Sequence, residues 1–377
     1  MKNKLLALCA LVTLSVSVFA QVNNPVITAV PSLNIAPDAR AGGMGDVGVA
    51  TSPDVNSQYW NAAKYVFMES DAGVSVSYTP WLRQLVPDIN LSYLAGYWKL
   101  DQRQALSASL RYFTMGAIAL MDEQGTTQGT ANPNEYSIDV AYSRLLSEKL
   151  SASATLRFIH SDLNNGINFA NGGSSVTMYP GSAVAADVAA YYRTHVALQD
   201  GDGKLAFGLS ISNIGSKISY DKNETSNFIP TNLRLGGSFE YPIDNFNKIS
   251  VSLDLNKLLV PTQDSLTSQQ YSDMSPITGI FKSFSAPGGF KEEMQEIMWS
   301  VGAEYAYNNQ FFVRGGYYNE NKYKGNRKYF TAGAGFKLNI FQLDASYIMA
   351  VAQSNPLDQT LRFSLSFDLY GLKNLIK

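Results

Sequence analysis

The chain has 377 residues and a formal net charge of −2, which disfavours a nucleic-acid-binding protein because such a protein carries a basic stripe. Charged residues make up only 16% of the chain, compared with about 25% in soluble domains. Aromatic residues reach 12%, with 22 Tyr and 19 Phe. Low charge and abundant Tyr without a long apolar run predict a surface that meets lipid through strands rather than helices.

The first twenty residues are predicted to be a cleavable signal peptide. Two lysines precede an apolar stretch over residues 5–18, and Ala20 ends a small-x-Ala cleavage site, so that Gln21 becomes the first mature residue. A membrane anchor is disfavoured because the apolar stretch is shorter than the ~20 residues that span a bilayer. The only cysteine, Cys9, lies in this segment, so the mature chain has no thiol for a disulfide, thiolate catalysis or a metal.

Short segments with a period of two run through the chain from residue 72 onward. In the last of them, Leu361, Phe363 and Leu365 alternate with the polar Arg362 and Ser364. Successive side chains of a strand point to opposite faces, so each segment has one apolar and one polar face. Leu365→Arg is therefore expected to impair assembly more than Ser364→Arg. About fourteen segments, each roughly eight to twelve residues long, have the length of a tilted membrane-spanning strand. They begin near Ala72, Asn90, Gln104, Asn134, Leu150, Val184, Lys204, Thr231, Lys248, Met298, Phe311, Lys328, Phe341 and Thr360.

The connections alternate between short and long, as in bacterial barrels with short periplasmic turns and long external loops. This alternation predicts that both termini lie in the periplasm. Charged residues fall on the polar faces, as expected because a midplane Arg or Lys facing lipid costs about 2–4 kcal/mol. A soluble β-sandwich also alternates, but it needs neither this many strands nor this placement of charge. The charged residues are Arg111, Asp139, Arg157, Asp187, Arg193, Arg234, Glu240, Asp254, Glu304, Arg314, Asp344, Arg362 and Asp368.

Residues 21–71 are not strand-like and are predicted to plug the barrel, whose lumen is too wide for its own side chains to fill. A disordered periplasmic tail is the alternative, disfavoured by aromatic residues such as Tyr59, Trp60 and Tyr65. The stretch GMGDVG at residues 43–48 matches the dinucleotide-binding pattern GxGxxG, yet no βαβ unit surrounds it. Its glycines are instead expected to permit tight turns or a close approach to the barrel wall.

The sequence thus predicts an all-β fold, a 14-stranded antiparallel transmembrane β-barrel with an N-terminal plug segment. The predicted parts are a signal peptide (1–20), a plug segment (21–71), the barrel (72–370) and a periplasmic C-terminal tail (371–377).

Candidate catalytic and metal-binding residues are few. The two histidines, His160 and His195, fall near strand ends on opposite sides of the predicted membrane, so they cannot readily share a metal. Neither has a Ser or Asp partner at a spacing typical of a catalytic triad. We therefore expect no enzyme activity, no catalytic or metal-binding residue and no cofactor.

One connection is far longer than the others. Roughly forty residues separate Asn256 from Met298, whereas loops beyond about 12–15 residues are uncommon unless they are functional or disordered. After Gly289, residues 292–297 are expected to form one or two helical turns. Two interpretations stay open, a lid packed on the barrel mouth or a partner-binding loop. The candidate partner-binding residues are Ile280, Phe281, Phe284 and Phe290.

Two stretches of the chain resemble a known family. DARAGGMGDVGVATSPDVNSQYWNAAK at residues 38–64 and APGGFKEEMQEI at residues 286–297 look like PorV, an outer-membrane component of the type IX secretion system of Bacteroidetes. The resemblance extends over essentially the whole mature chain. It includes a fourteen-strand layout that is similar to the long-chain fatty-acid transporter (FadL) superfamily.

The resemblance implies a shuttle in the outer membrane. PorV-like proteins associate with a giant translocon barrel of the SprA/Sov type and bind cargo through its C-terminal signal domain. They pass the cargo to a PorU-like sortase attachment complex at the cell surface, and the sortase activity belongs to that partner. The implied partners are these proteins and outer-membrane lipids, with no nucleic acid. The alternative is a FadL-like transporter of hydrophobic small molecules, which needs an apolar pocket that the polar lumenal residues disfavour.

Overall fold

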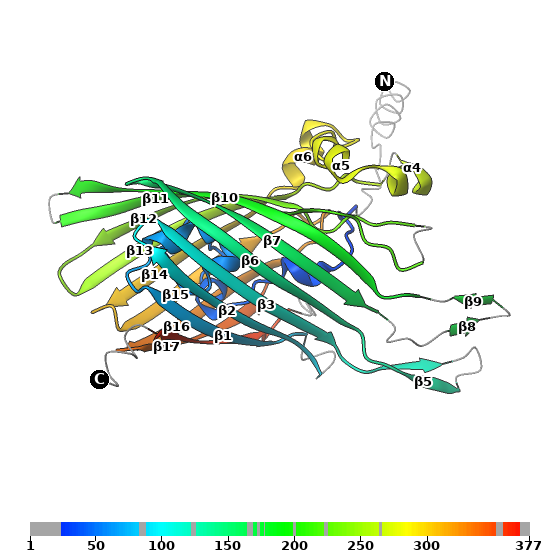
Figure 1. Ribbon diagram of the computed structural model, residues 1–377, viewed down its shortest axis with the longest axis horizontal. Helices are drawn as coiled ribbons and strands as arrows, with labels where there is room; N and C mark the ends of the chain where they lie inside the picture. Colours follow the sequence, from blue (N-terminus) through cyan, green and yellow to red (C-terminus); the bar gives the residue numbers. More distant parts are fainter. Residues whose placement is uncertain are drawn as a thin grey trace, which may run out of the picture.

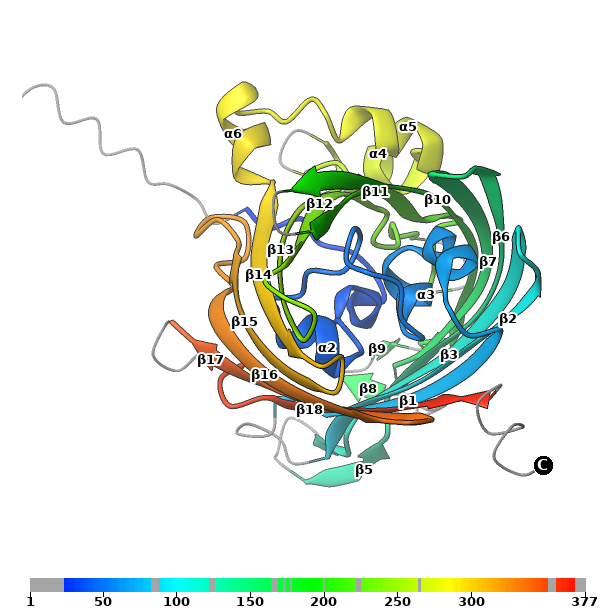
Figure 2. The same cartoon turned by 90° about the vertical axis from the view of Figure 1, so that its left-hand side faces the viewer.

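The computed structural model describes residues 24–82, 88–121, 126–163, 169–171, 174–176, 178–198, 201–221, 225–263, 266–351 and 357–369. Within these residues, fourteen antiparallel strands form a barrel (Figure 1) that closes where β1 pairs with β18 (Figure 2). The predicted fold class is confirmed. Among the same residues, no helix combines the length and the apolar character needed to cross a membrane. The predicted signal peptide (1–20) and C-terminal tail (371–377) lie outside the described residues.

The barrel strands begin within three residues of the predicted positions, because the period of two is strong in each. They are β1 (Ala72–Pro80), β2 (Ile89–Asp101), β3 (Gln104–Met115), β6 (Asn134–Ser147), β7 (Leu150–Asp162), β10 (Gly181–Leu198), β11 (Gly201–Gly215), β12 (Asn232–Pro242), β13 (Asn247–Leu258), β14 (Met298–Tyr307), β15 (Phe311–Asn319), β16 (Lys328–Leu338), β17 (Phe341–Ala350) and β18 (Leu361–Asp368).

Two small hairpins were not predicted. One pairs β4 (Ile118–Met121) with β5 (Thr127–Ala131), and the other pairs β8 (Phe169–Asn171) with β9 (Ser174–Val176). Both project beyond the ring of strands (Figure 1). Their strands have three to five residues, too few for alternation to distinguish a strand from a polar loop.

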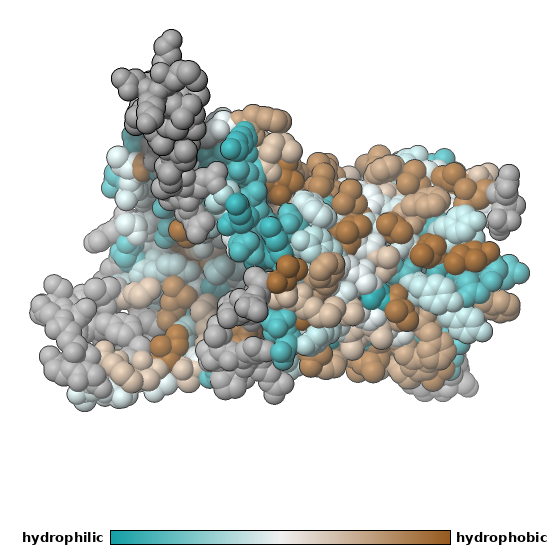
Figure 3. Space-filling model, turned by 180° about the vertical axis from the view of Figure 1, so that it is seen from behind, coloured by the Kyte–Doolittle hydropathy of each residue, from teal (hydrophilic) through white to brown (hydrophobic). Residues whose placement is uncertain are grey.

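Alternation along the strands separates a lipid-facing surface from a lumenal one. Outward side chains such as Leu94, Phe207 and Leu253 are large, apolar and exposed. Hydrophobic side chains cover much of the barrel wall (Figure 3). Of the charged residues predicted on the polar faces, all are buried except for Arg193, Glu240 and Asp368, which are half-buried. Buried charge inside and apolar surface outside is the arrangement that a bilayer requires.

The connections differ in length at the two ends of the barrel. At one end, here called the short-turn end, a few residues join the strands, as at 243–246 between β12 and β13 and at 308–310 between β14 and β15. The opposite end, here called the long-loop end, carries both hairpins and the connection at 259–297 between β13 and β14. The predicted alternation of short and long connections is therefore present.

The first and last described parts of the chain lie at opposite ends of the barrel, while the terminal residues themselves lie outside the described residues, so the periplasmic location of both termini stays a prediction. At the short-turn end, Asp368 of β18 accepts a hydrogen bond from Ser70, just before β1. At the long-loop end, the backbone N–H of Asn24 donates to the carbonyl of Tyr323 at 2.9 Å. The strand count places the start of β1 and the end of β18 together, but the segment before β1 runs the length of the lumen.

That segment fills the barrel as four short helices, η1 (Pro31–Asn34), α2 (Ala39–Gly42), α3 (Ser57–Trp60) and η2 (Ala62–Phe67), visible inside the ring in Figure 2. The Asp38 side chain caps α2 by accepting from the backbone N–H of Ala41 at 2.9 Å. In η2, Tyr65 stacks on Tyr97 of β2 with ring centroids 5.0 Å apart. The N-terminal segment is thus a plug packed on the inner wall.

Glycines let the plug backbone touch the wall. A Cβ on Gly316 of β15 would lie 2.1 Å from the carbonyl carbon of Met44. Gly45 has a φ of 74°, and a Cβ there would lie 2.7 Å from the backbone nitrogen of Tyr317. Only glycine fits both the positive φ and the contact. The GMGDVG stretch at residues 43–48 therefore makes the close approach to the wall that its glycines predicted.

Buried ion pairs fix the plug in place. Arg40 of α2 pairs with Glu304 of β14 at 3.0 Å and with Asp54 of the plug at 2.8 Å. Glu304 also accepts from Arg314 of β15 at 2.6 Å, and Arg314 pairs with Asp344 of β17 at 2.7 Å. This network constrains the position of the plug relative to the barrel wall, because removing any one partner leaves a buried charge uncompensated.

Candidate functional site

The long connection between β13 and β14 folds into three helices, α4 (Ser268–Asp273), α5 (Pro276–Lys282) and α6 (Phe290–Gln295). The helical turn predicted after Gly289 is confirmed as α6. The other two helices were missed, although each has a sequence signal. Thr267 and Gln270 form a capping box at α4, and Ser275 caps α5 just before a proline.

Three of the four candidate partner-binding residues are exposed on these helices or between them. The side chains of Phe281, Phe284 and Phe290 expose 72%, 52% and 81% of their area, whereas Ile280 is half-buried. Ile277 and Met294, which were not predicted as candidates, are also exposed. We call Ile277, Phe281, Phe284, Phe290 and Met294 the loop patch. Five large exposed apolar side chains on one connection are candidates for contact with a protein partner.

The helices do not close the barrel mouth. Figure 2 shows α4, α5 and α6 outside the ring of strands, on the side of β10 to β14. Figure 1 shows the same three helices standing away from the wall near the long-loop end. The loop patch is thus carried sideways from the barrel rather than packed across its opening.

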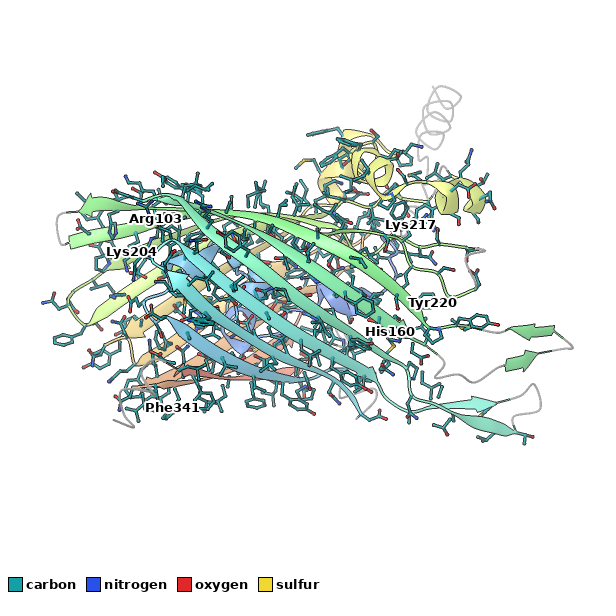
Figure 4. All side chains as sticks on the ribbon, in the orientation of Figure 1. Arg103, His160, Lys204, Lys217, Tyr220 and Phe341 are labelled. Atoms are coloured by element: carbon teal, nitrogen blue, oxygen red, sulfur yellow. The ribbon has the colours of Figure 1, made fainter. Side chains whose placement is uncertain are left out.

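Lys217, just beyond β11, anchors α4 to the barrel (Figure 4). Its Nζ donates to the carbonyls of Tyr271 at 2.6 Å and Ser272 at 2.8 Å, at the end of α4. The same ammonium lies 4.3 Å from the ring centroid of Phe228. Burial lowers the pKa of Lys217 below its ordinary value. The carbonyls at a helix C-terminus favour a cation, so this contact holds α4 in a defined position.

Two further lysines anchor α6. Lys257, at the end of β13, pairs with Glu293 at 2.9 Å and with Glu296. Lys324, in the connection between β15 and β16, pairs with Glu296 at 3.0 Å and with Glu292. Burial opposes the charged form of Glu292, but hydrogen bonds from Lys324 and a backbone N–H hold its pKa below the ordinary value. The framework of the loop is therefore fixed while its aromatic side chains stay exposed.

The first described residues of the chain cross beneath this loop. We call residues 24–29 the strap. The side chain of Asn24 donates to Glu292 at 3.3 Å, and the carbonyl of Ile27 accepts from the Tyr271 hydroxyl at 3.4 Å. The backbone N–H of Ala29 donates to the carbonyl of Phe228 at 2.9 Å. Sequence reasoning missed the strap because its partners lie about 200 residues or more further along the chain and leave no local pattern.

Beside the strap lies a cavity of ≈ 470 Å³, here called the mouth pocket. Its walls come from the strap, the start of the plug, the ends of β13 and β14, and the connection between β15 and β16. The lining residues are Pro25, Val26, Ile27, Thr28, Pro31, Asn34, Leu258, Glu296, Met298, Glu320, Lys324, Gly325 and Arg327.

The two histidines lie toward opposite ends of the barrel. His160 lies at the long-loop end of β7, where Nδ1 is 3.0 Å from the Ser182 hydroxyl, while His195 lies near the short-turn end of β10. Across the described residues, no group of three or more His, Cys, Asp or Glu side chains is arranged to hold a metal ion.

These features define a class, an outer-membrane β-barrel with a plugged lumen and an ordered side loop. A family model described as "Type IX secretion system protein PorV" matches residues 19–265. The chain therefore belongs to the PorV family, as the resemblance at residues 38–64 predicted. The second resembling stretch, at residues 286–297, lies beyond the matched residues. No curated protein sequence matches the chain.

Solved structures share the barrel fold. The toluene transporter TodX of Pseudomonas putida is 10% identical, with a TM-score of 0.52 over 87% of this chain and 96% of that one. The monoaromatic hydrocarbon channel CymD is 13% identical, with a TM-score of 0.50 over 88% and 97%. A FadL homologue from Pseudomonas aeruginosa is 12% identical, with a TM-score of 0.48 over 92% and 99%. At such identities, the two likenesses with TM-scores of 0.50 or more show the fold alone.

Family and fold together mark the chain as an outer-membrane component of transport or secretion.

Proposed function

We propose that the protein is a shuttle of the type IX secretion system. It binds the C-terminal signal domain of cargo, receives that cargo from the translocon barrel and presents it to the sortase attachment complex. It carries no enzyme activity of its own. The observation that supports this proposal most strongly is the loop patch, because exposed Phe281, Phe284 and Phe290 stand on helices whose framework is anchored by buried ion pairs. A pre-organised apolar surface binds a protein partner at a lower entropic cost.

The lengths of the connections support an orientation in the membrane. Outer-membrane barrels keep short turns in the periplasm and long loops outside. The long-loop end, with the loop patch and the strap, then faces the cell exterior, where cargo is delivered. We propose that residues 1–20 are removed as a signal peptide and that residues 371–377 form a periplasmic tail.

Transport of hydrophobic small molecules through the lumen is the less favoured function. The plug packs backbone to backbone on the wall at Met44, and its Arg40 is held by two carboxylates. The lumenal wall beside it carries buried charges such as Arg314 and Asp344. A conduit for hydrocarbons needs an apolar path, which this lining does not favour.

The test replaces the three exposed aromatic residues of the loop patch by Ser in one variant, F281S/F284S/F290S. Exposed substitutions change stability by about ±0.5 kcal/mol, so the barrel should fold and stay heat-modifiable. An aromatic anchor at an interface contributes about 2 kcal/mol or more, so binding of the purified signal domain should fall at least thirty-fold or so.

The matched control is Phe246→Ser, an equally exposed Phe in a turn at the short-turn end. It should leave signal-domain binding and cargo secretion unchanged. Normal secretion and co-purification with the translocon in the triple variant would place the partner contacts elsewhere on the protein.

A further inference from the structure

A hollow lies on the outer face of the barrel wall, across β7 and β10 to β13. We call it the wall hollow. Its volume of ≈ 510 Å³ falls within the range of about 300–1,000 Å³ typical of ligand sites. All of its lining residues belong to these wall strands, and none belongs to the plug, the strap or the long connection. The wall hollow is therefore a separate feature from the mouth pocket and the loop patch.

The hollow forms where small residues stand among large ones. In the register of the sheet, Gly237 of β12 lies between Phe207 of β11 and Leu253 of β13, which are both large and exposed. In the neighbouring row, Ala190 of β10 pairs with the exposed Leu209 of β11. The small residues thus form the floor of the hollow, and the large side chains form its sides.

Packing within the protein does not explain Gly237. Gly208 and Gly236 lie on the lumenal face of the same strands, where a Cβ would lie 2.2 Å and 2.4 Å, respectively, from atoms of Val49 in the plug. A Cβ on Gly237 would find its nearest neighbour in the Phe207 ring, at an ordinary 3.7 Å. A glycine inside a strand weakens it and often marks a place where a ligand approaches closely. The space above Gly237 is therefore open to a molecule outside the barrel.

The lining of the wall hollow is apolar. None of the lining residues is charged, and the Tyr192 hydroxyl is the only polar side-chain group among them. The backbone groups of β11, β12 and β13 are paired with one another along the ladder. An occupant of the hollow is consequently held by apolar contacts, as a hydrocarbon chain is.

The membrane supplies the occupant, because the hollow lies on the lipid-facing surface of the wall. Lipid tails are as apolar as leucine, so a protein gains no hydrophobic free energy by replacing them there. Its association depends instead on close backbone packing or on hydrogen bonds. Exposed Phe207 and Leu253 keep a second backbone away from Gly237, and the lining offers almost no hydrogen bonds. A flexible acyl chain, which needs neither, is favoured over a protein partner.

The position of the hollow selects one leaflet. One row of the sheet runs from Leu253 in the middle of β13, across β12, β11 and β10, to Leu150, the first residue of β7. Leu150 follows the connection from β6, at the short-turn end. Lys149 in that connection is exposed, and a lysine at the membrane surface attracts lipid phosphate. A chain in the hollow therefore has its headgroup at the short-turn end.

We infer that the wall hollow binds one acyl chain of a phospholipid from the periplasmic leaflet. The chain lies over Gly237 between Phe207 and Leu253, and the headgroup lies on the side of Lys149. This inference goes beyond the proposed function, and only the choice of leaflet rests on the orientation proposed with it. The lipid and the plug then pack on opposite faces of one stretch of wall, because Val49 touches Gly208 and Gly236 from the lumen.

The first experiment is native mass spectrometry of the full-length protein, extracted in mild detergent from vesicles of phosphatidylethanolamine and phosphatidylglycerol. The parent protein should retain one phospholipid molecule. Gly237→Phe fills the hollow and should lower the retained fraction about ten-fold, since displacing even two methylene groups has an effect of that order. Gly315→Phe is the matched control, an exposed glycine of β15 whose Cβ would have its nearest neighbour at 3.9 Å, and it should retain lipid as the parent does.

The second experiment uses the parent protein, so it does not depend on the folding of a variant. The vesicles contain phosphatidylethanolamine with a diazirine in the middle of one acyl chain, and labelled residues are identified by mass spectrometry after irradiation. Labelling of Phe207 and Leu253 should exceed that of Val313 of β15, which is at least as exposed, several-fold. Labelling in proportion to exposed area around the whole barrel would overturn the inference.

Three other outcomes would also overturn it. They are equal lipid retention by Gly237→Phe and the parent, retention of lipid A in place of phospholipid by protein extracted from cells, and capture of a membrane protein by a benzophenone amino acid at Leu253 in intact cells. The loop patch takes no part in this site, so F281S/F284S/F290S should retain the phospholipid. Failure of the lipid site would therefore leave the shuttle function standing, and failure of the shuttle function would leave the lipid site standing.

Discussion

We predict that the buried ion pairs of Arg40 hold the plug in the lumen. Arg40→Met keeps most of the alkyl packing but removes a guanidinium that donates to Glu304 at 3.0 and 3.2 Å and to Asp54 at 2.8 Å. It also removes donation to the Ser52 carbonyl at 3.0 Å. Breaking a buried pair costs about 3–5 kcal/mol. Because Glu304 still pairs with Arg314 in the variant, we expect a cost at the lower end of this range, about 3 kcal/mol. The fraction of molecules with an undocked plug should then be roughly a hundred-fold larger than in the parent protein.

The assay is conductance in planar bilayers, supported by hydrogen exchange over residues 38–60. Arg40→Met should open ion-conducting events that the parent barrel lacks and should raise exchange in the plug, while the strand ladder stays protected. Lys204→Met is the control, because Lys204 forms a pair of similar length, 2.9 Å with Glu240, but exposes 49% of its side chain. Exposed pairs contribute about 0–1 kcal/mol. Equal conductance in the two variants would refute the assignment of the plug's stability to buried charge.

Two further predictions test the faces of the wall. Gly316→Val should displace the plug and raise hydrogen exchange around Met44, because a Cβ at Gly316 would lie 2.1 Å from the Met44 backbone. The control, Gly315→Val, should be tolerated, because Gly315 faces outward and its nearest contact would be at 3.9 Å. Similar hydrogen exchange of the plug in both variants would contradict the packing. Leu253→Arg in the middle of β13 should cost about 2–4 kcal/mol of folding free energy. Ser250 is half-buried and faces the lumen, so Ser250→Arg should assemble nearly normally. Equal yields of heat-modifiable barrel from the two variants would contradict the assignment of the two faces.

The comparison first expected between Leu365 and Ser364 changes with the structure. Leu365 faces lipid, as predicted, and Ser364 faces the lumen. However, the Ser364 hydroxyl accepts from the backbone N–H of Ala39 in the plug at 2.8 Å and lies 2.7 Å from the Ser77 hydroxyl. An Arg at this position would collide with the plug, so the lumenal face is not uniformly tolerant.

The alternating pattern of apolar and polar residues is enough to predict the barrel. The start of each of the fourteen barrel strands is predicted within three residues, and the charged side chains are assigned to the correct face, because alternation is a local pattern that a bilayer enforces residue by residue. The candidate site is also predicted from the sequence, because the connection between β13 and β14 is unusually long and carries Phe281, Phe284 and Phe290.

The construction of the long-loop end depends on contacts between distant parts of the chain, which the sequence pattern does not reveal. Lys217, Lys257 and Lys324 hold α4 and α6, and Asn24 reaches Glu292 from the far end of the sequence. These partners are separated by tens to hundreds of residues, and a local periodic pattern does not identify which charged side chains will pair. The location of the strap at the long-loop end likewise follows from the path of the plug through the lumen, because the even strand count fixes only where the barrel itself begins and ends.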